Sequence, residues 1–275
     1  MPAKETESPF PGARIVRLGS TTSTMDEARA LAAAGAARGS AVVADRQTRG
    51  RGRVPGRSWA GEPGASLLCT VILDSGDLSG GGFPLRVGLA LLRTIETLVP
   101  AARDRLALKW PNDVVVAYPR RAPTGDDGPS AKGADSAAPG ARKLAGILCE
   151  GSGGRVLAGV GVNLLRQPWP GGCKLPPVSV EEAFHPADPS AVPSRDSVLL
   201  EFLGQLGSAI SEEEALAEVG RRLYARGKRV RFVPGLPGSE PVEGCVEGLD
   251  HSGSLRIRLA AGSVVTFASG ELDFG

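Results

Sequence analysis

The stretch "QTRGRGRVPGR" (residues 47–57) sets four arginines among glycines and contains no acidic residue. It lies between two segments of strand length, the β-branched "AVVADRQ" (41–47) and the apolar "ASLLCTVIL" (65–73). Guanidinium groups bind carboxylate and phosphate oxygens through paired hydrogen bonds, and glycines let the backbone approach the same oxygens. The stretch therefore predicts a loop that joins two strands and closes over an anion. Taken alone, its composition also fits a solvated basic turn or an RNA-binding loop.

Two better-known phosphate-binding motifs do not explain this loop. The segment "GRGRVPG" (50–56) comes close to the dinucleotide pattern G-x-G-x-x-G, but its third glycine is one place late. A loop and a strand follow it, whereas that pattern needs a helix whose N-terminus points at the pyrophosphate. The chain also lacks the G-K-S or G-K-T sequence of a Walker phosphate loop.

The overall charge of the chain is nearly balanced. Its 275 residues include 32 Lys and Arg against 30 Asp and Glu, a formal net charge of +2. Broad electrostatic binding to nucleic acid needs a clustered basic face, so this balance counts against it. The only histidines are His185 and His251, which argues against a histidine-based metal site or catalytic triad.

The cysteines and the apolar runs indicate a protein of the cytoplasm. Four cysteines, at 69, 149, 173 and 245, lack the spacing of a metal finger and are interpreted as buried, reduced thiols. No apolar run reaches the roughly 18 residues of a membrane span, so no membrane partner is expected. The N-terminal residues have no apolar core like that of a signal peptide.

Periodicity and turn residues predict mixed secondary structure up to about residue 226. Strands are expected at 13–20, 41–47, 65–73, 105–110 and 113–118, with a hairpin of 142–151 and 155–165 closed by Gly153 and Gly154. Helices are expected at 24–40, 83–99, 195–210 and 212–226. For the first helix, Thr24 is the expected N-cap and Gly35 or Gly39 the expected stop. In the second, Leu85, Leu89, Leu92 and Val99 fall on or near one face.

Three segments differ from this pattern. Residues 1–13 are expected to form a flexible polar lead. Residues 119–142 contain alanine as their only apolar type among Pro, Gly, Ser, Thr and charged residues, which predicts a disordered insert between two strands. From residue 227 short strands alternate with glycine-rich turns, which predicts a small β-barrel over 227–275.

Three further stretches hold candidate functional residues that are weak when each is taken alone. In "KWPND" (109–113) a proline breaks a strand, and we interpret Trp110 and Pro111 as a strand bend packed into the core. Lys143 opens the apolar "KLAGILCE" (143–150), where an exposed lysine is the ordinary interpretation. Asn163, at the end of "GVGVN" (159–163), fits a turn residue.

Taken together, in this order and spacing, these motifs closely resemble those of the biotin protein ligases. The resemblance rests on "STMDEA" (23–28), the Gly-Arg loop with Trp59, "KWPND", "KLAGILCE" and "GVGVN". The terminal "GKRV…VEGLDHSGSLRIRLAAG…ASGELDF" resembles the small C-terminal barrel of that family. The likeness extends over roughly residues 14–274, almost the whole chain.

The resemblance implies a fold and a reaction. The implied fold is α+β: a mixed sheet with helices, like that of class II aminoacyl-tRNA synthetases, over 14–226, and an SH3-like β-barrel over 227–275. The implied reaction joins biotin to Mg-ATP to give biotinyl-AMP, then transfers biotin to a lysine of a biotin carboxyl carrier protein or domain. No DNA partner is expected, because residues 1–13 leave no room for a helix-turn-helix domain. Both a monomer and a homodimer remain open.

The resemblance also carries over site residues, position by position. Those implied to be catalytic are Lys143, Arg51 and Arg53. Those implied to bind biotin are Ser23, Thr24, Met25, Gln47, Gly50, Arg51, Gly52, Arg53 and Lys143. Those implied to lie near ATP or the adenylate are Trp59, Lys109, Asn112, Asp113 and Asn163. Mg²⁺ is expected to come with ATP, since no side-chain motif indicates a metal site.

The chain departs from the family pattern at two positions. Met25 stands where many members have asparagine, so a polar contact near biotin is missing or comes from the backbone. Arg57 follows Arg53 one residue later than in some relatives, which makes its carry-over less secure. Lipoate–protein ligase is the nearest rival interpretation. A nucleic-acid-binding module and a non-catalytic biotin-binding protein are rivals from other classes.

Overall fold

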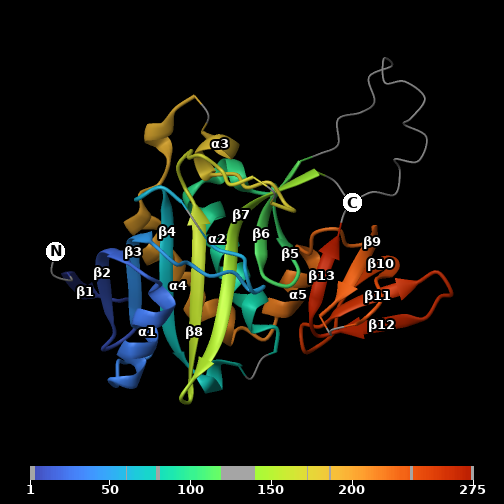
Figure 1. Ribbon diagram of the computed structural model, residues 1–275, viewed down its shortest axis with the longest axis horizontal. Coiled ribbons are helices and arrows are strands. Elements are labelled where there is room, and N and C mark those ends of the chain that lie inside the picture. Colours follow the sequence, from blue (N-terminus) through green and yellow to red (C-terminus); the bar gives the residue numbers. More distant parts are fainter. Residues whose placement is uncertain are drawn as a thin grey trace.

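Two β-sheets organise the chain in the computed structural model (Figure 1). The structure describes residues 4–59, 61–78, 81–118, 140–171, 173–185, 187–235 and 238–273. The larger sheet has eight strands in the order β1-β2-β3-β4-β8-β7-β6-β5. Its strands are β1 (Lys4–Glu7), β2 (Arg14–Thr21), β3 (Ala41–Gln47), β4 (Ser66–Asp74), β5 (Leu106–Lys109), β6 (Asp113–Tyr118), β7 (Gly140–Ser152) and β8 (Arg155–Asn163). Only β2 and β3 pair in parallel, so the predicted mixed sheet is confirmed.

Helices cover both faces of this sheet (Figure 1). α1 (Thr24–Ala33) packs on one face, against β3, β4 and β8. α2 (Phe83–Leu98) and α4 (Arg195–Ser211) pack together on the other, and α5 (Ala215–Arg221) packs against α2. The shorter helical elements are α3 (Val180–Phe184), η1 (Ser75–Leu78), η2 (Pro100–Ala102) and η5 (Pro189–Ala191). Alternation along β3 divides the core, because Val42 packs toward α1 whereas Ala41 and Val43 join the larger core.

The apolar face predicted for α2 is confirmed. Leu85, Leu89 and Leu92 are at most 3% exposed; Val99 is equally buried but lies just beyond the helix, as its C-cap. The helix begins after Gly82, whose φ of +55° suits glycine, and has proline in its first turn, where the missing N–H is not needed.

The flexible lead predicted for residues 1–13 is wrong over residues 4–13. β1 pairs with β2 in an antiparallel ladder and forms the sheet edge. Phe10 is 8% exposed and lies 5.1 Å below the guanidinium of Arg38. A Cβ at Gly39 would lie 2.1 Å from the Phe10 ring, so the glycine makes room for it. One buried aromatic ring thus anchors an otherwise polar segment.

The start of α1 also differs from the prediction. Ser23, not Thr24, is the N-cap, because Ser23 has extended backbone and its hydroxyl accepts from Met25 N. Thr24 is the first helical residue and directs its hydroxyl to other partners. The helix ends at Ala33 and Gly35 follows at φ +85°, so Gly35 is the stop that the sequence offered.

Two further boundaries move. The last residues of the predicted insert, 140–142, continue β7 by pairing with residues 116–118 of β6; residues 119–139 lie outside the described chain. The helix predicted at 212–226 is confined to α5. It ends early because Leu223 bridges to Leu108 in parallel and Tyr224 N donates to Leu108 O at 2.9 Å. These backbone bonds to β5 compete with helix continuation.

The C-terminal residues form the second sheet, which is antiparallel throughout (Figure 1). Its strands are β9 (Arg229–Pro234), β10 (Val242–Leu249), β11 (Leu255–Leu259), β12 (Val264–Phe267) and β13 (Gly270–Asp273), in the order β12-β11-β10-β9-β13. The small C-terminal β domain is therefore confirmed, with β13 added to the four predicted strands. Its buried side chains belong to the same core as the larger sheet.

Trp110 joins the two sheets. It lies in the turn between β5 and β6, is 2% exposed, and follows a strand as the bend interpretation requires; the Trp110–Pro111 peptide bond is cis. Its Nε1 donates to Gly253 O at 3.1 Å, and its ring centroid lies 5.8 Å from that of Phe232 in β9. The prediction that Trp110 packs in the core is confirmed, and the core it enters is the one between the sheets.

No helix in the described ranges is long and apolar enough to cross a membrane. Within the same residues no group of three His, Cys, Asp or Glu side chains is placed to hold a metal ion.

We predict that Trp110→Ala lowers the free energy of unfolding by about 3–5 kcal/mol, because it leaves a cavity in the core between the two sheets. Trp110→Phe keeps most of the ring and loses the bond to Gly253, so its cost should be about 1 kcal/mol. Denaturant titration of both variants measures the two values. Equal costs for the two would contradict a packing role for the ring.

Candidate functional site

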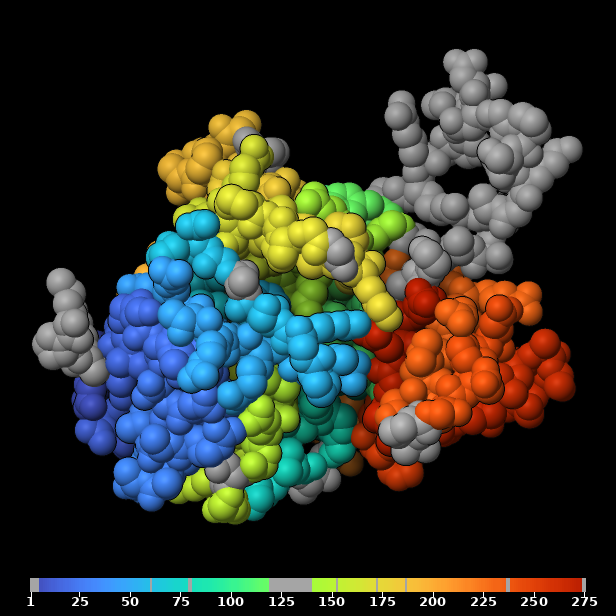
Figure 2. Space-filling model, in the orientation of Figure 1, coloured from blue at the N-terminus to red at the C-terminus, as the bar shows by residue number. Residues whose placement is uncertain are grey.

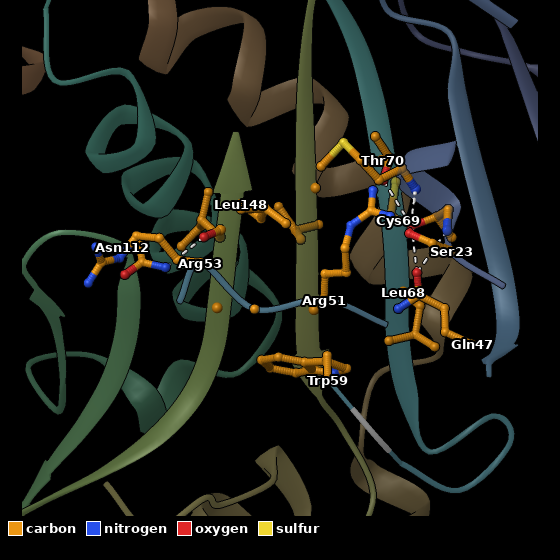
Figure 3. Close-up of a pocket in the computed structure, with 18 of the residues that line it drawn as sticks. Ser23, Gln47, Arg51, Arg53, Trp59, Leu68, Cys69, Thr70, Asn112 and Leu148 are labelled. Carbon is orange, nitrogen blue, oxygen red and sulfur yellow. Dashed lines mark hydrogen bonds between the residues drawn. The ribbon is translucent and has the colours of Figure 1, made fainter. Parts of the chain in front are cut away.

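A pocket with a cavity volume of about 70 Å³ lies on the α1 face of the large sheet, beneath the Gly-Arg loop (Figure 3). The residues that line it are Ser23, Thr24, Met25, Gln47, Arg51, Gly52, Arg53, Trp59, Leu68, Cys69, Thr70, Asn112, Lys143, Gly146, Ile147, Leu148, Gly159, Val160 and Gly161. Ten of these were expected from the sequence, so the motifs, although far apart in the chain, meet at one place.

One end of the pocket is a network of neutral hydrogen-bonding groups. Gln47 Oε1 accepts from Thr24 N at 2.8 Å and from Thr24 Oγ1 at 3.1 Å. Thr24 Oγ1 also lies 2.9 Å from Thr70 Oγ1 of β4. Ser23, Thr24 and Thr70 are buried. Because α1 holds the amide oxygen of Gln47, this end is a fixed polar surface that suits a neutral polar group of a ligand.

The floor of the pocket is made of glycines on neighbouring strands. Gly146 of β7 pairs directly with Gly161 of β8, and Leu148 pairs with Gly159. A Cβ at Gly161 would lie 2.5 Å from Trp59 Cε2, and one at Gly146 would lie 2.8 Å from Trp59 Cζ3. A Cβ at Gly159 would lie 2.8 Å from Met25 Cε. The glycines therefore make room for Trp59 and Met25 against the sheet.

Cationic and amide groups lie at the other end. Lys143 Nζ pairs with Asp113 Oδ1 at 2.7 Å and lies 5.4 Å from the Trp59 ring centroid. Asn112 Nδ2 donates to Ile147 O at 2.7 Å, and Ile147 N donates back to Asn112 O at 2.9 Å. These two bonds fix the turn between β5 and β6 onto β7. The pocket thus runs from a neutral polar end to an end with fixed positive charge.

The Gly-Arg loop folds back on itself above this pocket. Gly52 N donates to Arg57 O at 2.8 Å, and Trp59 N donates to Gly50 O at 3.1 Å. A Cβ at Gly50 would lie 2.4 Å from Trp59 O, so the close approach requires glycine there. Gly50 therefore shapes the loop and does not line the pocket.

Arg51 is held by acidic groups of the protein itself. Its guanidinium binds Asp26 of α1 through two bonds, of 3.0 and 2.9 Å. The hydrogen bond from Arg51, helped by one from Arg29, lowers the pKa of Asp26 although burial opposes it. The same bond raises the pKa of Arg51. Both groups are therefore charged at neutral pH.

Two more arginines of the loop, Arg53 and Arg57, reach the C-terminal sheet. Arg53 donates to Gly270 O at 3.0 Å, and Arg57 pairs with Glu271 of β13. Figure 2 shows the segment of the loop (light blue) meeting the C-terminal sheet (red). Lys174 Nζ also contacts Glu271, at 2.9 Å. Burial raises the pKa of Glu271, but the bonds from Arg57 and Lys174 outweigh it and lower that pKa to about 2.

Besides Gly50, three expected site residues lie beside the pocket without lining it. Asp113 contacts Lys143, as described. Lys109 is 7% exposed, and burial lowers its pKa against the attraction of Asp113 and Glu271. Asn163 is 4% exposed and donates to Lys143 O and Val178 O. In this arrangement Asn163 fixes the backbone that carries Lys143.

Sequence reasoning missed part of the pocket, most clearly Thr70 and the three floor glycines. The sequence did contain a signal for Thr70, because it is a polar residue inside the apolar run 65–73. In the structure it is 0% exposed. Gly159 and Gly161 had another, because two glycines at a spacing of two in a strand empty one face of it.

The cysteines were predicted to be buried. Cys69 is buried and Cys149 is half-buried, but the prediction is wrong for Cys173 and Cys245, which are exposed. All four are free thiols. Burial raises the pKa of Cys69, which lines the pocket, and of Cys149 to about 12. Both therefore stay protonated and inert at neutral pH.

The chain is similar to known ligases over nearly its full length. Residues 17–165 match the model of the biotin/lipoate A/B protein ligase family, and residues 227–275 match that of the biotin protein ligase C terminal domain. A biotin–acetyl-CoA-carboxylase ligase of Mycobacterium tuberculosis is 30% identical over 260 residues, 90% of this chain and 84% of that protein. A biotin–acetyl-CoA-carboxylase ligase of Paracoccus denitrificans is 33% identical over 277 residues, which cover 94% of this chain and 99% of that protein. The fold is similar to that of the Aquifex aeolicus biotin protein ligase in complex with biotin and ATP, at 23% identity and a TM-score of 0.73. The match covers 96% of this chain and 98% of that chain.

We predict that Gly161→Ala lowers the free energy of unfolding by about 1–3 kcal/mol, because the new methyl group displaces the Trp59 ring. Gly151→Ala on β7 is the matched control, since nothing lies within 4 Å of its added Cβ. Denaturant titration compares the two. A Gly161→Ala variant as stable as the control would mean that Trp59 does not need this floor.

We predict that Glu271→Gln destabilises the protein in a pH-dependent way. The folded-state pKa of Glu271, about 2, lies below its usual 4.5, so its ion pairs stabilise the protein above about pH 4.5. That stabilisation is lost as the pH falls from 4.5 toward 2. The difference in unfolding free energy between wild type and variant should therefore shrink on acidification. Asp273→Asn, on the same strand, is the control; a Glu271→Gln difference that is constant with pH would contradict the assignment.

Proposed function

The chain belongs to the biotin/lipoate A/B protein ligase family, and on that premise we propose how its pocket binds biotin and the adenylate made from it. The protein is a biotin–acetyl-CoA-carboxylase ligase. In the first step a biotin carboxylate oxygen attacks the α-phosphorus of ATP, an acyl–phosphate bond forms, and pyrophosphate leaves. In the second a lysine amine of the carrier attacks the acyl carbon, loses a proton, and AMP leaves.

We assign the ureido ring of biotin to the neutral polar end. This end offers hydroxyl and amide groups of Ser23, Thr24, Gln47 and Thr70 in fixed positions, and a ureido group both donates and accepts hydrogen bonds. Met25 is 3% exposed and packs in the small core beneath α1, so it supplies apolar contact only. Thr70 is the group that we propose in place of the missing asparagine.

We assign the biotin carboxylate and the α-phosphate to Lys143 and Arg53. Two anions repel each other, and their reaction needs positive charge that is in place beforehand. Lys143 is held at the pocket by Asp113, and Arg53 by a neutral carbonyl oxygen that leaves its charge uncompensated. This pair of cations, at the end of the pocket opposite the neutral polar groups, is the observation that carries the proposal. Arg51 could join them only by leaving Asp26.

We place the nucleotide at the Trp59 and Asn112 side of the pocket. Trp59 offers an aromatic face, and Asn112 an amide fixed by β7. Gly50 and Gly52 shape the loop, while Lys109, Asp113 and Asn163 act as positioning residues. Mg²⁺ would come bound to the phosphates of ATP, the usual source of its ligands in nucleotide sites.

We further propose that residues 14–226 form the catalytic domain and that 227–275 form a domain that holds the Gly-Arg loop from the other side. The carrier must place its lysine at the Lys143 end of the pocket, since the acyl carbon lies there. Four free thiols fit a reducing compartment, which supports a cytoplasmic location.

We predict that the purified protein releases pyrophosphate from Mg-ATP with biotin and not with lipoate. Lys143→Ala should reduce the rate about 100- to 1,000-fold, because it removes a cation fixed beforehand next to the reacting anions. Lys174→Ala, which removes a lysine outside the pocket, is the control. A Lys143→Ala rate near that of wild type would remove its proposed role, and release with lipoate alone would reassign the substrate.

We predict that Arg53→Gly releases biotinyl-AMP before transfer and labels bystander lysines. The variant loses both the cation that faces the adenylate and the bond from the loop to Gly270. Mass spectrometry of an added non-substrate protein measures this labelling. Labelling that stays confined to the carrier would mean that Arg53 does not retain the adenylate.

A further inference from the structure

Arg51 and Arg53 are two residues apart but extend in different directions. Figure 3 shows Arg53 on the Asn112 side of the pocket, whereas Arg51 extends toward Ser23 and Thr70. Arg53 donates to a neutral carbonyl oxygen, and none of the described carboxylates forms an ion pair with it. Arg51 instead forms ion pairs with two carboxylates of the protein. The charge of Arg51 is therefore balanced by the protein, whereas that of Arg53 is not.

The groups that hold Arg51 form a four-membered charge cluster, Asp26, Arg29, Arg51 and Glu150. Arg51 binds both oxygens of Asp26 and lies 3.9 Å from Glu150 Oε1. Arg29 Nη1 lies 2.7 Å from Asp26 Oδ1, and Arg29 Nη2 lies 2.5 Å from Glu150 Oε2. Two positive and two negative charges balance, and Arg29 offsets the repulsion between the two carboxylates.

The cluster connects two elements that line the pocket, α1 and β7. Asp26 and Arg29 belong to α1, whose first turn lines one wall. Glu150 belongs to β7, two residues beyond Leu148 on the same face of the strand, and β7 lines the other wall. Arg51 comes from the loop above and completes the connection. Its side chain thus lines the pocket and links α1 to β7.

We propose that Arg51 is a strap that closes the pocket over bound biotin and its adenylate, and that Asp26, Arg29 and Glu150 are positioning residues that form its seat. The proposal rests on the function proposed above. Charged hydrogen bonds with two-point geometry give the strap direction as well as strength. The four side chains are 31–41% exposed, so the strap can open to admit biotin and to release product.

Added salt should weaken the hold of the strap on the pocket. Ion pairs at such exposure are screened by added salt. Retention of the adenylate should therefore weaken as ionic strength rises. A variant without Arg51 should already have lost this dependence.

The test measures the first-order rate at which radiolabelled biotinyl-AMP leaves the protein after dilution into excess unlabelled biotin. Arg51→Gln and Asp26→Asn should each raise this rate about three- to tenfold, because each breaks the two-point bond. Asp26→Glu, which keeps the carboxylate, should recover most of the retention. Asp74→Asn breaks an ion pair with Arg155 at the far end of the β7–β8 hairpin and serves as the control at the wild-type rate.

A double variant separates the strap from a general structural effect. If Asp26 acts through Arg51, Arg51→Gln/Asp26→Asn should release the adenylate no faster than Arg51→Gln alone. An undiminished Asp26→Asn effect in that background, or wild-type release by Arg51→Gln, would overturn the proposal. Should Asp26→Asn fail to fold, Glu150→Gln tests the seat from β7 with a smaller expected increase.

The outcome is separable from that of the proposed function. If wild type forms no biotinyl-AMP, the proposed function fails before the strap is tested on it. If wild type forms and retains the adenylate but Arg51→Gln retains it equally, the function stands and the strap does not.

Discussion

Repulsion between two anions is the constraint around which this structure is arranged. A carboxylate and a phosphate can react only where positive charge is fixed before they arrive, since reorganising water to supply it is costly. Lys143 and Arg53 supply that charge in our proposal, and each is held by a different part of the molecule: Lys143 by Asp113 of β6, Arg53 by Gly270 of β13. The C-terminal sheet is therefore part of the site although it contributes no residue to the pocket lining.

That dependence explains why Trp110 matters. The ring lies in the turn that carries Asn112 and leads into Asp113. It packs against Phe232 of β9, the strand that pairs with β13. The packing of Trp110 against the C-terminal sheet therefore sets the distance between the Lys143 end of the pocket and the sheet that holds Arg53. Packing between the sheets and electrostatics in the pocket are coupled through one buried side chain.

The sequence predicted what is local or motif-borne. The strands around the Gly-Arg loop, the apolar face of α2 and most of the pocket follow from periodicity and from motifs that carry their own chemistry. The rest depends on contacts between distant residues. Phe10 is one aromatic ring in a polar stretch, and its fit against Gly39, together with the pairing of β1 with β2, makes residues 4–13 part of the fold. The seat of Arg51 joins Asp26 to Glu150 across 124 positions, which no spacing rule reveals.

The floor of the pocket shows how stability and function trade against each other here. Glycine inside a strand costs about 0.5–1 kcal/mol relative to alanine, and Gly146, Gly159 and Gly161 lie in the middle of adjacent strands. Their added Cβ atoms would strike Trp59, Lys143 or Met25, so no side chain fits there while those groups hold their places. The centre of the sheet is therefore less stable because the pocket needs the space. On the opposite face of β8 the buried Val162 packs in the core and helps to keep the strand in register.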